Sequence, residues 1–248
     1  VAVCFVIIAL FINRQHHYLV NYSVGFDKED ILLLTTNDYN GSLLHTDIKI
    51  FAEEVMRNPI IKDFTASQSV IGRDWMNNTN MSSDGTGRMF SWNDAKVLSN
   101  FLPFFNIPVI EGQEMEERIV GQKNQVVVNE EFLKLHQIEN GLQGLNEDML
   151  LKNNHVVGIV SNFNYASLFN NIGSLMISEE EINNLPYLYF KVSQRHFVEA
   201  RKHIEETWKK FSNKEIQFGF LDDQLEQLYQ SQANLAHAIS FVSLIIIL

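Results

Sequence analysis

The sequence lacks the cysteines needed for covalent or metal-based reinforcement. Its 248 residues include a single cysteine, Cys4, which stands inside an apolar run at the start of the chain. An internal disulfide and a cysteine metal cage are both excluded, because each needs more than one thiol. The fold must therefore be held by its own core. The length and the apolar content of 46% are sufficient for one or two compact bodies.

Positive charge is scarce, and so are the motifs of common enzyme classes. The chain has 19 Lys and Arg against 30 Asp and Glu, a net charge of −11, which argues against nucleic-acid binding because that needs a basic face. No H-E-x-x-H, G-x-S-x-G or P-loop is present. His196 and His203 have no accompanying ligand motif, and Glu179 to Glu181 is typical of a charged helix start or a solvated turn. We expect no catalytic residue, no cofactor and no metal ion.

Long apolar runs occur at the two ends of the chain. Val1 to Ile12 is apolar throughout, and between Ala238 and Leu248 only two serines interrupt the apolar residues. A membrane-spanning helix needs about 20 apolar residues, so we expect two transmembrane helices, both cut short, with an extracytoplasmic domain between them. No small-residue cleavage pattern follows Ile12, which favours a retained anchor over a signal peptide.

The stretch before the second apolar run has the spacing of a helix that packs against another helix. Apolar residues and one glutamine recur there in steps of three and four. We predict a stalk helix whose coupling interface consists of Leu221, Leu225, Leu228, Tyr229, Gln232 and Leu235. Two partners for this seam stay open, the first helix of the same domain and a moving element of a larger complex.

Two strand–helix–strand units are predicted between the apolar runs. Their elements are a strand at 31–34, a helix at 45–57, a strand at 60–67, a strand at 187–192, a helix at 197–211 and a strand at 216–220. Two such units in one chain favour an α+β fold, a split βαβ sheet of ferredoxin-like type with a second α+β lobe inserted between its halves.

The inserted region contains further strand and helix signals. Strands are predicted at 125–128, 155–160 and 172–177. Asn129 is expected to cap a helix whose first residues are acidic, and Gly141 to Asp148 is expected to be a turn.

Two stretches of the inserted region are candidates for binding a partner. Asp74 to Gly87 is long and polar, and we leave its role open. Methionines and a tryptophan in or near it would form an adaptable hydrophobic surface; they are Trp75, Met76, Met81 and Met89. Leu98 to Phe105 concentrates phenylalanines beside Pro103, and we favour an aromatic core under a loop over an exposed docking patch.

Several motifs along the chain carry a resemblance to a known family. They are Asn21 to Glu29, Phe104 to Ile107 with Gly112, Val126 to Phe132, Val156 to Val160 followed by Asn162 to Tyr165 and Leu168, and Phe220 to Asp223 with Tyr229. In their order and spacing they resemble the periplasmic core domain of MacB-type (FtsX-like) ABC transporter permeases, in the form common among Bacteroidetes. The family frequently has an aspartate and a histidine where this chain has Asn162 and Asn164. Because asparagine carries no charge, that difference argues against charge-dependent chemistry at residues 162–164.

The resemblance implies a porter-like subdomain with an inserted, sabre-like lobe. The expected division is the end of transmembrane helix 1 with a stalk (1–20), the first porter-like half (21–69), the inserted lobe (70–184), the second half (185–221), and the stalk helix with the start of transmembrane helix 2 (222–248).

The resemblance also implies a non-catalytic function. A cytoplasmic ABC ATPase would drive the permease, and the movement would reach the extracytoplasmic side by mechanotransmission. The implied location is the bacterial inner membrane, with this domain on the periplasmic side. The implied partners are the ATPase subunit, a second permease subunit or repeat in a dimer, the membrane, and a periplasmic or outer-membrane protein. The alternative is an extracytoplasmic sensor domain of a signalling receptor, and a membrane-anchored enzyme is the least favoured of the three.

Overall fold

The structure is a computed structural model that describes residues 23–36, 47–73, 75, 79–83, 89–116, 124–147, 154–213 and 215–228. The chain divides into two compact units, Val24–Phe220 and a smaller one made of Val1–Ser23 and Leu221–Leu248. Both predicted membrane spans lie outside the described residues. Among the helices that the structure describes, none is long and apolar enough to cross a bilayer.

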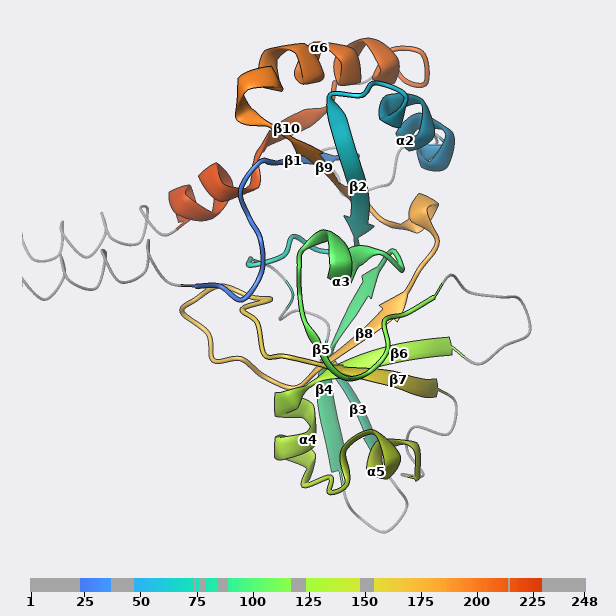
Figure 1. Cartoon of the computed structure of the whole chain (residues 1–248), viewed down its shortest axis with the longest axis vertical. Coiled ribbons are helices and arrows are strands. Elements are labelled where there is room, and N and C mark those ends of the chain that lie inside the picture. The colour runs from blue at the N-terminus through green and yellow to red at the C-terminus, as the bar shows by residue number, and fades with distance from the viewer. Residues whose placement is uncertain are drawn as a thin grey trace, which may run out of the picture. The chain divides into compact units, whose positions relative to one another are not determined.

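Four strands of the larger unit form an antiparallel sheet in which the two predicted βαβ units interleave (Figure 1). β1 (Ile31–Thr35) pairs with β10 (Gln217–Phe220) on one side and with β9 (Tyr187–Val192) on the other, and β9 pairs next with β2 (Ile61–Ser67). In the order β10-β1-β9-β2, each inner strand lies between strands of the other unit. This arrangement confirms the predicted α+β class and the split βαβ sheet.

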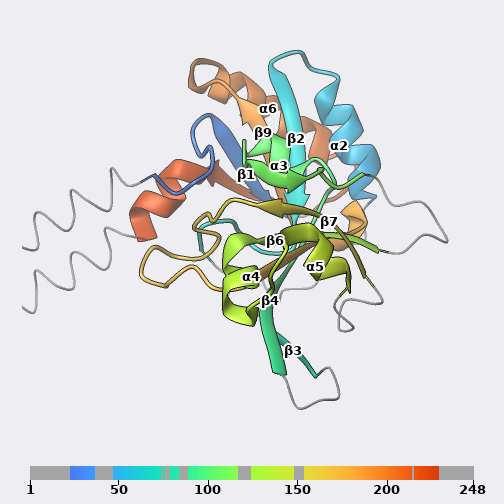
Figure 2. The same cartoon turned by 60° about the horizontal axis from the view of Figure 1, so that its bottom comes forward.

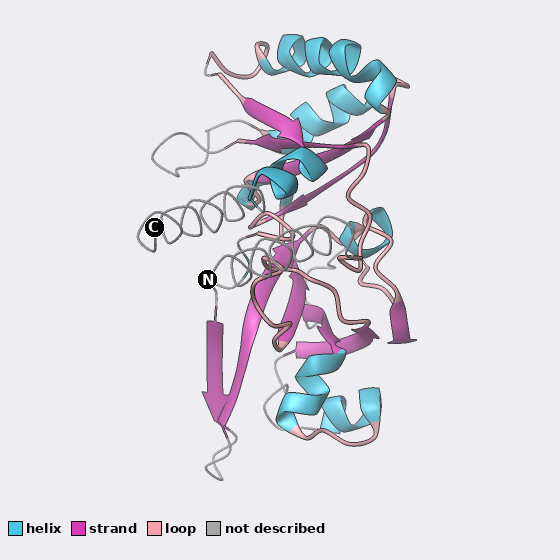
Figure 3. Ribbon diagram, turned by 90° about the vertical axis from the view of Figure 1, so that its left-hand side faces the viewer, coloured by secondary structure: helices cyan, strands magenta, loops and turns pink. Residues whose placement is uncertain are grey.

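Two helices, α2 (Ile48–Met56) and α6 (Phe197–Trp208), pack against each other beside this sheet (Figures 1 and 3). The carboxylate of Asp47 caps α2 by accepting a hydrogen bond from the Ile50 N–H at 3.2 Å. Phe51 meets Trp208 edge to face, with ring centroids 5.0 Å apart. As its helical spacing predicts, α2 buries one face, which consists of Ile48, Phe51, Ala52 and Val55.

The same sheet continues from β2 into the inserted region through a short pairing at Ser67 and Val97. The strands that follow, in spatial order, are β4 (Met89–Val97), β8 (Leu175–Glu179), β6 (Asn124–Asn129), β7 (Asn154–Val160) and β5 (Val109–Gly112). The pairings β4–β8 and β6–β7 are parallel, whereas β6–β8 and β5–β7 are antiparallel. The inserted region is therefore a mixed sheet, in contrast to the antiparallel sheet that it interrupts.

Short helices and a hairpin complete the inserted region. α4 (Glu130–His136) contacts β6 and β8, and α5 (Gly141–Glu147) contacts β7 and β5. α3 (Phe101–Phe104) lies against β2. β3 (Thr79–Ser83) pairs with β4 to form a hairpin, drawn at the bottom of Figure 2.

Two expectations for the inserted region were wrong. The predicted turn at 141–148 is the helix α5; its glycines disfavour a helix, but the burial of Leu145 against β7 outweighs that preference. Part of the predicted loop at 74–87 is the strand β3, whose sequence Thr-Asn-Met-Ser-Ser has no alternating apolar pattern. Its pairing with β4 is a non-local contact that the local sequence does not specify.

The phenylalanine-rich stretch before β5 is core, as favoured above. Phe101, Leu102, Phe104 and Phe105 are all buried. They lie near the meeting point of the split sheet and the inserted strands, since α3 contacts β2.

Candidate coupling site

The first residues of the larger unit, 24–27, are called the entry segment below. Hydrogen bonds attach them to two distant parts of the chain. The Val24 carbonyl accepts hydrogen bonds from the Asn164 backbone N–H at 2.8 Å and from the Asn164 side-chain amide at 3.4 Å. The Asp27 N–H donates to the Phe105 carbonyl at 2.9 Å. The entry segment is therefore fixed both to the end of α3 and to the connection between β7 and β8.

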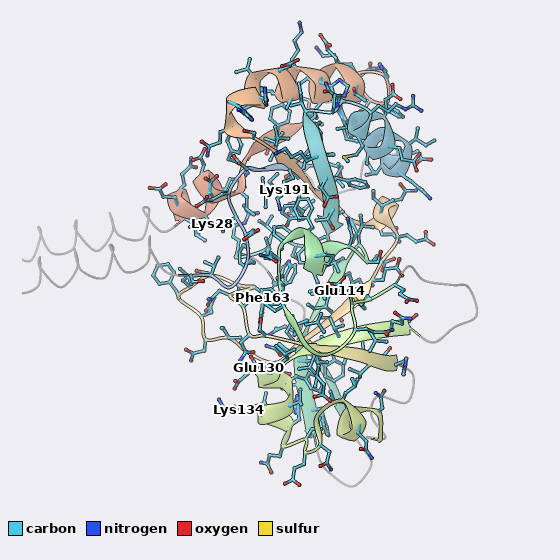
Figure 4. All side chains as sticks on the ribbon, viewed as in Figure 1. Lys28, Glu114, Glu130, Lys134, Phe163 and Lys191 are labelled. Carbon is cyan, nitrogen blue, oxygen red and sulfur yellow. The ribbon has the colours of Figure 1, made fainter. Side chains whose placement is uncertain are left out.

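A glycine permits this close approach. Gly25 has a φ of +83°, in the left-handed region that glycine adopts without strain. A Cβ atom at this position would lie 2.9 Å from the Cβ atom of Phe163, which is labelled in Figure 4. The backbone contact with Phe163 gives an independent reason for glycine here.

A buried aromatic cluster surrounds the entry segment and joins the split sheet to the inserted region. Phe26 meets Phe105 and Phe163 edge to face, at centroid distances of 5.9 Å and 6.4 Å. Tyr189 of β9 meets Phe105 at 5.1 Å. Such pairs stabilise beyond the apolar area that they bury. The full cluster consists of Phe26, Trp75, Phe101, Phe105, Phe163, Tyr165 and Tyr189.

The hydroxyl group of Tyr189 is fully buried but well bonded. It shares a hydrogen bond with the Ser67 hydroxyl at 2.9 Å and accepts one from the Ile71 N–H at 3.2 Å. Burial raises the pKa of Tyr189 far above its ordinary value, because desolvation disfavours the phenolate more than these hydrogen bonds favour it. Tyr189 is thus a neutral structural group that ties β9 to the segment after β2.

On its other side, the β7–β8 connection is bonded to α4 and β8 through Asn129. The Asn129 amide donates to the Asn162 side-chain oxygen at 3.0 Å and to the Gly173 carbonyl at 2.8 Å. Its oxygen accepts from the Leu175 N–H at 2.9 Å and from the Phe132 N–H at 3.1 Å. The second of these bonds confirms the predicted helix cap. The other three were not foreseen.

Motifs that are far apart in the sequence therefore meet at one place. Gly25, Phe105, Asn129 and the 162–165 stretch all lie in one connected set of contacts. The sequence indicated each motif separately, but it gave no signal for the link between Val24 and Asn164. The entry segment is thus linked by direct contacts to the inserted region and, through Phe105 and Tyr189, to the split sheet.

Comparison with solved structures identifies the fold. The periplasmic region of MacB from Actinobacillus actinomycetemcomitans aligns over 85% of this chain and 97% of that one, with a TM-score of 0.56 and 15% sequence identity. The chain has the fold of the MacB periplasmic region. The resemblance inferred from sequence motifs is thereby confirmed. No protein-family model and no curated protein sequence matches the chain.

Two further structures are similar at lower scores. A domain described as that of a permease protein from Porphyromonas gingivalis is 12% identical and aligns over 78% of this chain and 90% of its own, with a TM-score of 0.46. The extracellular domain of the ABC-type transporter YknZ from Gram-positive bacteria is 10% identical and aligns over 76% and 98%, with a TM-score of 0.43.

The predicted stalk interface of this MacB-like domain is described only in part. Residues 221–228 are helical. Leu221 and Leu225 are buried, with 0% and 1% of their surface exposed, and Leu228 is partly exposed. Tyr229, Gln232 and Leu235 lie outside the described residues. The coupling role of the seam stays a prediction.

The candidate partner loop of the MacB-like domain needs a correction at Trp75. This residue is only 1% exposed, and its indole N–H donates to the Ser69 carbonyl within the aromatic cluster. A partner cannot reach it without opening the core. Met89 on β4 is 56% exposed and remains available. Met76 lies outside the described residues, and for Met81 the structure describes only the backbone, within β3.

Charged groups gather near a cavity of about 630 Å³ that Glu53, Glu180 and Lys49 help to line. Lys96 forms an ion pair with Glu180 at 3.0 Å. Desolvation of the Glu180 carboxyl opposes its ionisation, but hydrogen bonds from Asn184 and Lys96 outweigh it and lower the pKa of Glu180. The described residues include no group of His, Cys, Asp or Glu side chains arranged to hold a metal ion.

The pKa of Asp94 on β4 depends on the same charged groups, Glu180 and Lys96, and can be tested through its effect on stability. Burial raises the pKa of Asp94 above 3.8, and Glu180 adds to the effect, whereas Lys96 opposes it. Because the folded state holds this proton more tightly than the unfolded state, ionisation of Asp94 destabilises the fold as pH rises from 3.8 through the folded-state pKa. We expect Asp94→Asn to increase the unfolding free energy at neutral pH.

The measurement is urea unfolding of both proteins over a series of pH values. The gain from Asp94→Asn should shrink as pH falls toward 3.8 and disappear below 3.8, since the wild-type carboxyl is then protonated in both states. An Asn variant that is less stable than wild type at neutral pH would show that Asp94 makes a favourable charged interaction instead.

Proposed function

We propose that this chain is the extracytoplasmic domain of an ABC transporter permease subunit. In this proposal the domain is non-catalytic. It couples ATP hydrolysis by a cytoplasmic subunit to work outside the membrane, either the export of a small molecule, peptide or lipoprotein, or the activation of a partner protein. The proposed location is the bacterial inner membrane, with the domain on the periplasmic side.

The observation that carries the proposal is the match to the MacB periplasmic region over nearly the whole of both chains. The part of this chain outside the alignment is 15% of its length, which is much shorter than the inserted region at 70–184. The alignment therefore includes residues of the inserted region as well as the split sheet. We retain the predicted division at residues 69/70 and 184/185 as part of the proposal. β2 ends before the first boundary, and β9 begins after the second.

The entry segment supplies a physical basis for coupling. A displacement can be transmitted only through elements that are packed tightly enough to move together. The Val24 carbonyl and the Asp27 N–H are bonded to different parts of the unit, and Phe26 packs between their neighbours Phe105 and Phe163. All of these partners belong to the inserted region, and Phe105 also meets Tyr189 of β9. A pull on the chain at Val24 would therefore act directly on the inserted region and, through Phe105 and Tyr189, on the split sheet.

The test is affinity purification of the full-length protein from its native membrane, followed by mass spectrometry of the proteins that accompany it. An ABC ATPase in stoichiometric amount is the expected result. A chain whose own peptides include a kinase or another signalling domain, with no ATPase alongside, would overturn the proposal in favour of the sensor-domain alternative.

A further inference from the structure

The connection between β7 and β8 belongs to a stretch without charge. From Ser161 to Ser178 there are 18 residues and none is Asp, Glu, Lys or Arg, although these types make up 20% of the chain. They belong to the longest charge-free run within the part of the chain that the structure describes. Charged residues normally make up about a quarter to a third of a protein surface, so an exposed run of this length without any of them is unusual.

The tip of this connection is apolar and exposed. Phe169 is 47% exposed, and Leu168 and Ile172 on either side of it are partly exposed. The tip is a defined turn, because the Asn170 N–H donates to the Ser167 carbonyl at 2.9 Å and the Phe169 N–H donates to the Ser167 hydroxyl at 3.4 Å. The two residues between Phe169 and Ile172 are asparagines, which are polar and uncharged. The tip therefore presents a large aromatic ring among uncharged polar groups.

The base of the connection lies beside the entry segment. Asn164 is bonded to Val24, and Phe163 contacts Gly25. Eleven residues separate Val24 from Ile12, where the first apolar run ends. They span about 18 Å if they are helical. The interfacial layer of a bilayer adds about 6 Å on each side of its hydrocarbon core, and the five-residue step from Asn164 to the tip can reach up to about 17 Å. If the 13–23 stretch is helical and the connection points back along it, the tip reaches the lipid headgroups.

We propose that the tip at 167–172 docks on the headgroup layer of the membrane, as a contact in addition to the two predicted spans. Aromatic rings flanked by neutral polar groups suit this layer. A charge-free tip is also the surface of an acidic domain that anionic lipids repel least. The inference rests on the proposed function, because it assumes that the apolar run before Val24 is embedded in a membrane. Together with the two predicted spans, this contact would attach the domain to the membrane at three places and so fix its orientation relative to the bilayer.

The test introduces a tryptophan at the tip of the full-length protein. The Phe169→Trp protein is reconstituted into vesicles of phosphatidylethanolamine and phosphatidylglycerol, with or without bromine on the acyl chains near the headgroups. The wild-type emission is subtracted. The matched control is Val198→Trp on α6, a site that is 80% exposed. The expected result is that the tryptophan at position 169 emits at a shorter wavelength than the one at position 198. Brominated lipid should quench the emission of the first and leave the emission of the second unchanged.

The outcomes separate this inference from the proposed function. Emission from the Phe169→Trp protein that brominated lipid leaves unchanged, in a protein that purifies with its ATPase, would overturn the docking contact and leave the proposed function intact. A full-length protein that is washed from membranes by alkaline carbonate would overturn both. Circular dichroism of each variant verifies that the substitution leaves the fold unchanged.

Discussion

Replacing Asn129 with alanine is expected to lower the free energy of unfolding by about 3–5 kcal/mol. The side chain is fully buried and makes four hydrogen bonds. Alanine would leave the Leu175 N–H, the Phe132 N–H and the Gly173 carbonyl without these partners. Each buried polar group that loses its partner costs about 1–3 kcal/mol, and the loss of a helix cap alone costs about 1 kcal/mol. Few single substitutions away from the apolar core would cost more.

The measurement is urea unfolding of a segment covering residues 23–228. Asn184→Ala is the matched control, since Asn184 is an exposed asparagine whose amide donates to Glu180 at 2.9 Å. Its replacement should cost less than about 1 kcal/mol. A second variant, Asn129→Asp, keeps the two accepted bonds but places a carboxylate oxygen against the Asn162 oxygen and the Gly173 carbonyl at a fully buried site, so it should be at least as unstable as the alanine variant. Equal stability of the Asn129→Ala and Asn184→Ala proteins would refute the role assigned to this network.

Local patterns predicted the elements of the split sheet because each is marked by its own residues. The buried face of α2 follows helical spacing, and the strands of the antiparallel sheet are short apolar or alternating runs. The interleaved order of those strands also followed, since two βαβ units in one chain have few ways to share a sheet. The sequence therefore specified the part of the fold that depends on periodicity and on general rules of connection.

The inserted region was less predictable because its structure depends on distant contacts. β5 was missed, and it has three exposed residues out of four, so burial leaves no pattern in it. β3 is a strand because β4 pairs with it, and α5 is a helix because β7 covers Leu145. Neither cause lies within the element itself.

In the candidate site, too, local features were predicted and long-range contacts were not. Asn129 was recognised as a helix cap, which is a local property, and that role is confirmed. Its bonds to Asn162 and Gly173 join residues more than 30 positions apart, and no rule of spacing predicts them. Trp75 was a candidate for a partner surface because it lies in a polar stretch, yet the aromatic cluster buries it. A single large apolar residue in a polar stretch gives no indication of which side of the chain faces the core.

Introducing a charge at Leu225 is expected to abolish coupling in the intact complex. Leu225 is 1% exposed on the helix at 221–228, where the predicted seam begins. An aspartate there would have to lose its hydration or force the helix out of its packing, and either change costs several kcal/mol. We therefore expect Leu225→Asp to leave ATP hydrolysis by the cytoplasmic subunit active, while export or partner activation falls to background.

The matched control places the same charge on the same helix. Gln227 is exposed, so Gln227→Asp should leave both activities close to those of wild type. A milder variant, Leu225→Ala, keeps the test valid if the aspartate variant fails to accumulate; removing a buried leucine costs about 2–5 kcal/mol, and coupling should then be reduced rather than lost. ATP hydrolysis and transport are measured together in proteoliposomes, and their ratio is the quantity compared. An unchanged ratio in Leu225→Asp and Leu225→Ala would mean that motion reaches the domain without this seam, and the entry segment at Val24 would then be the remaining route.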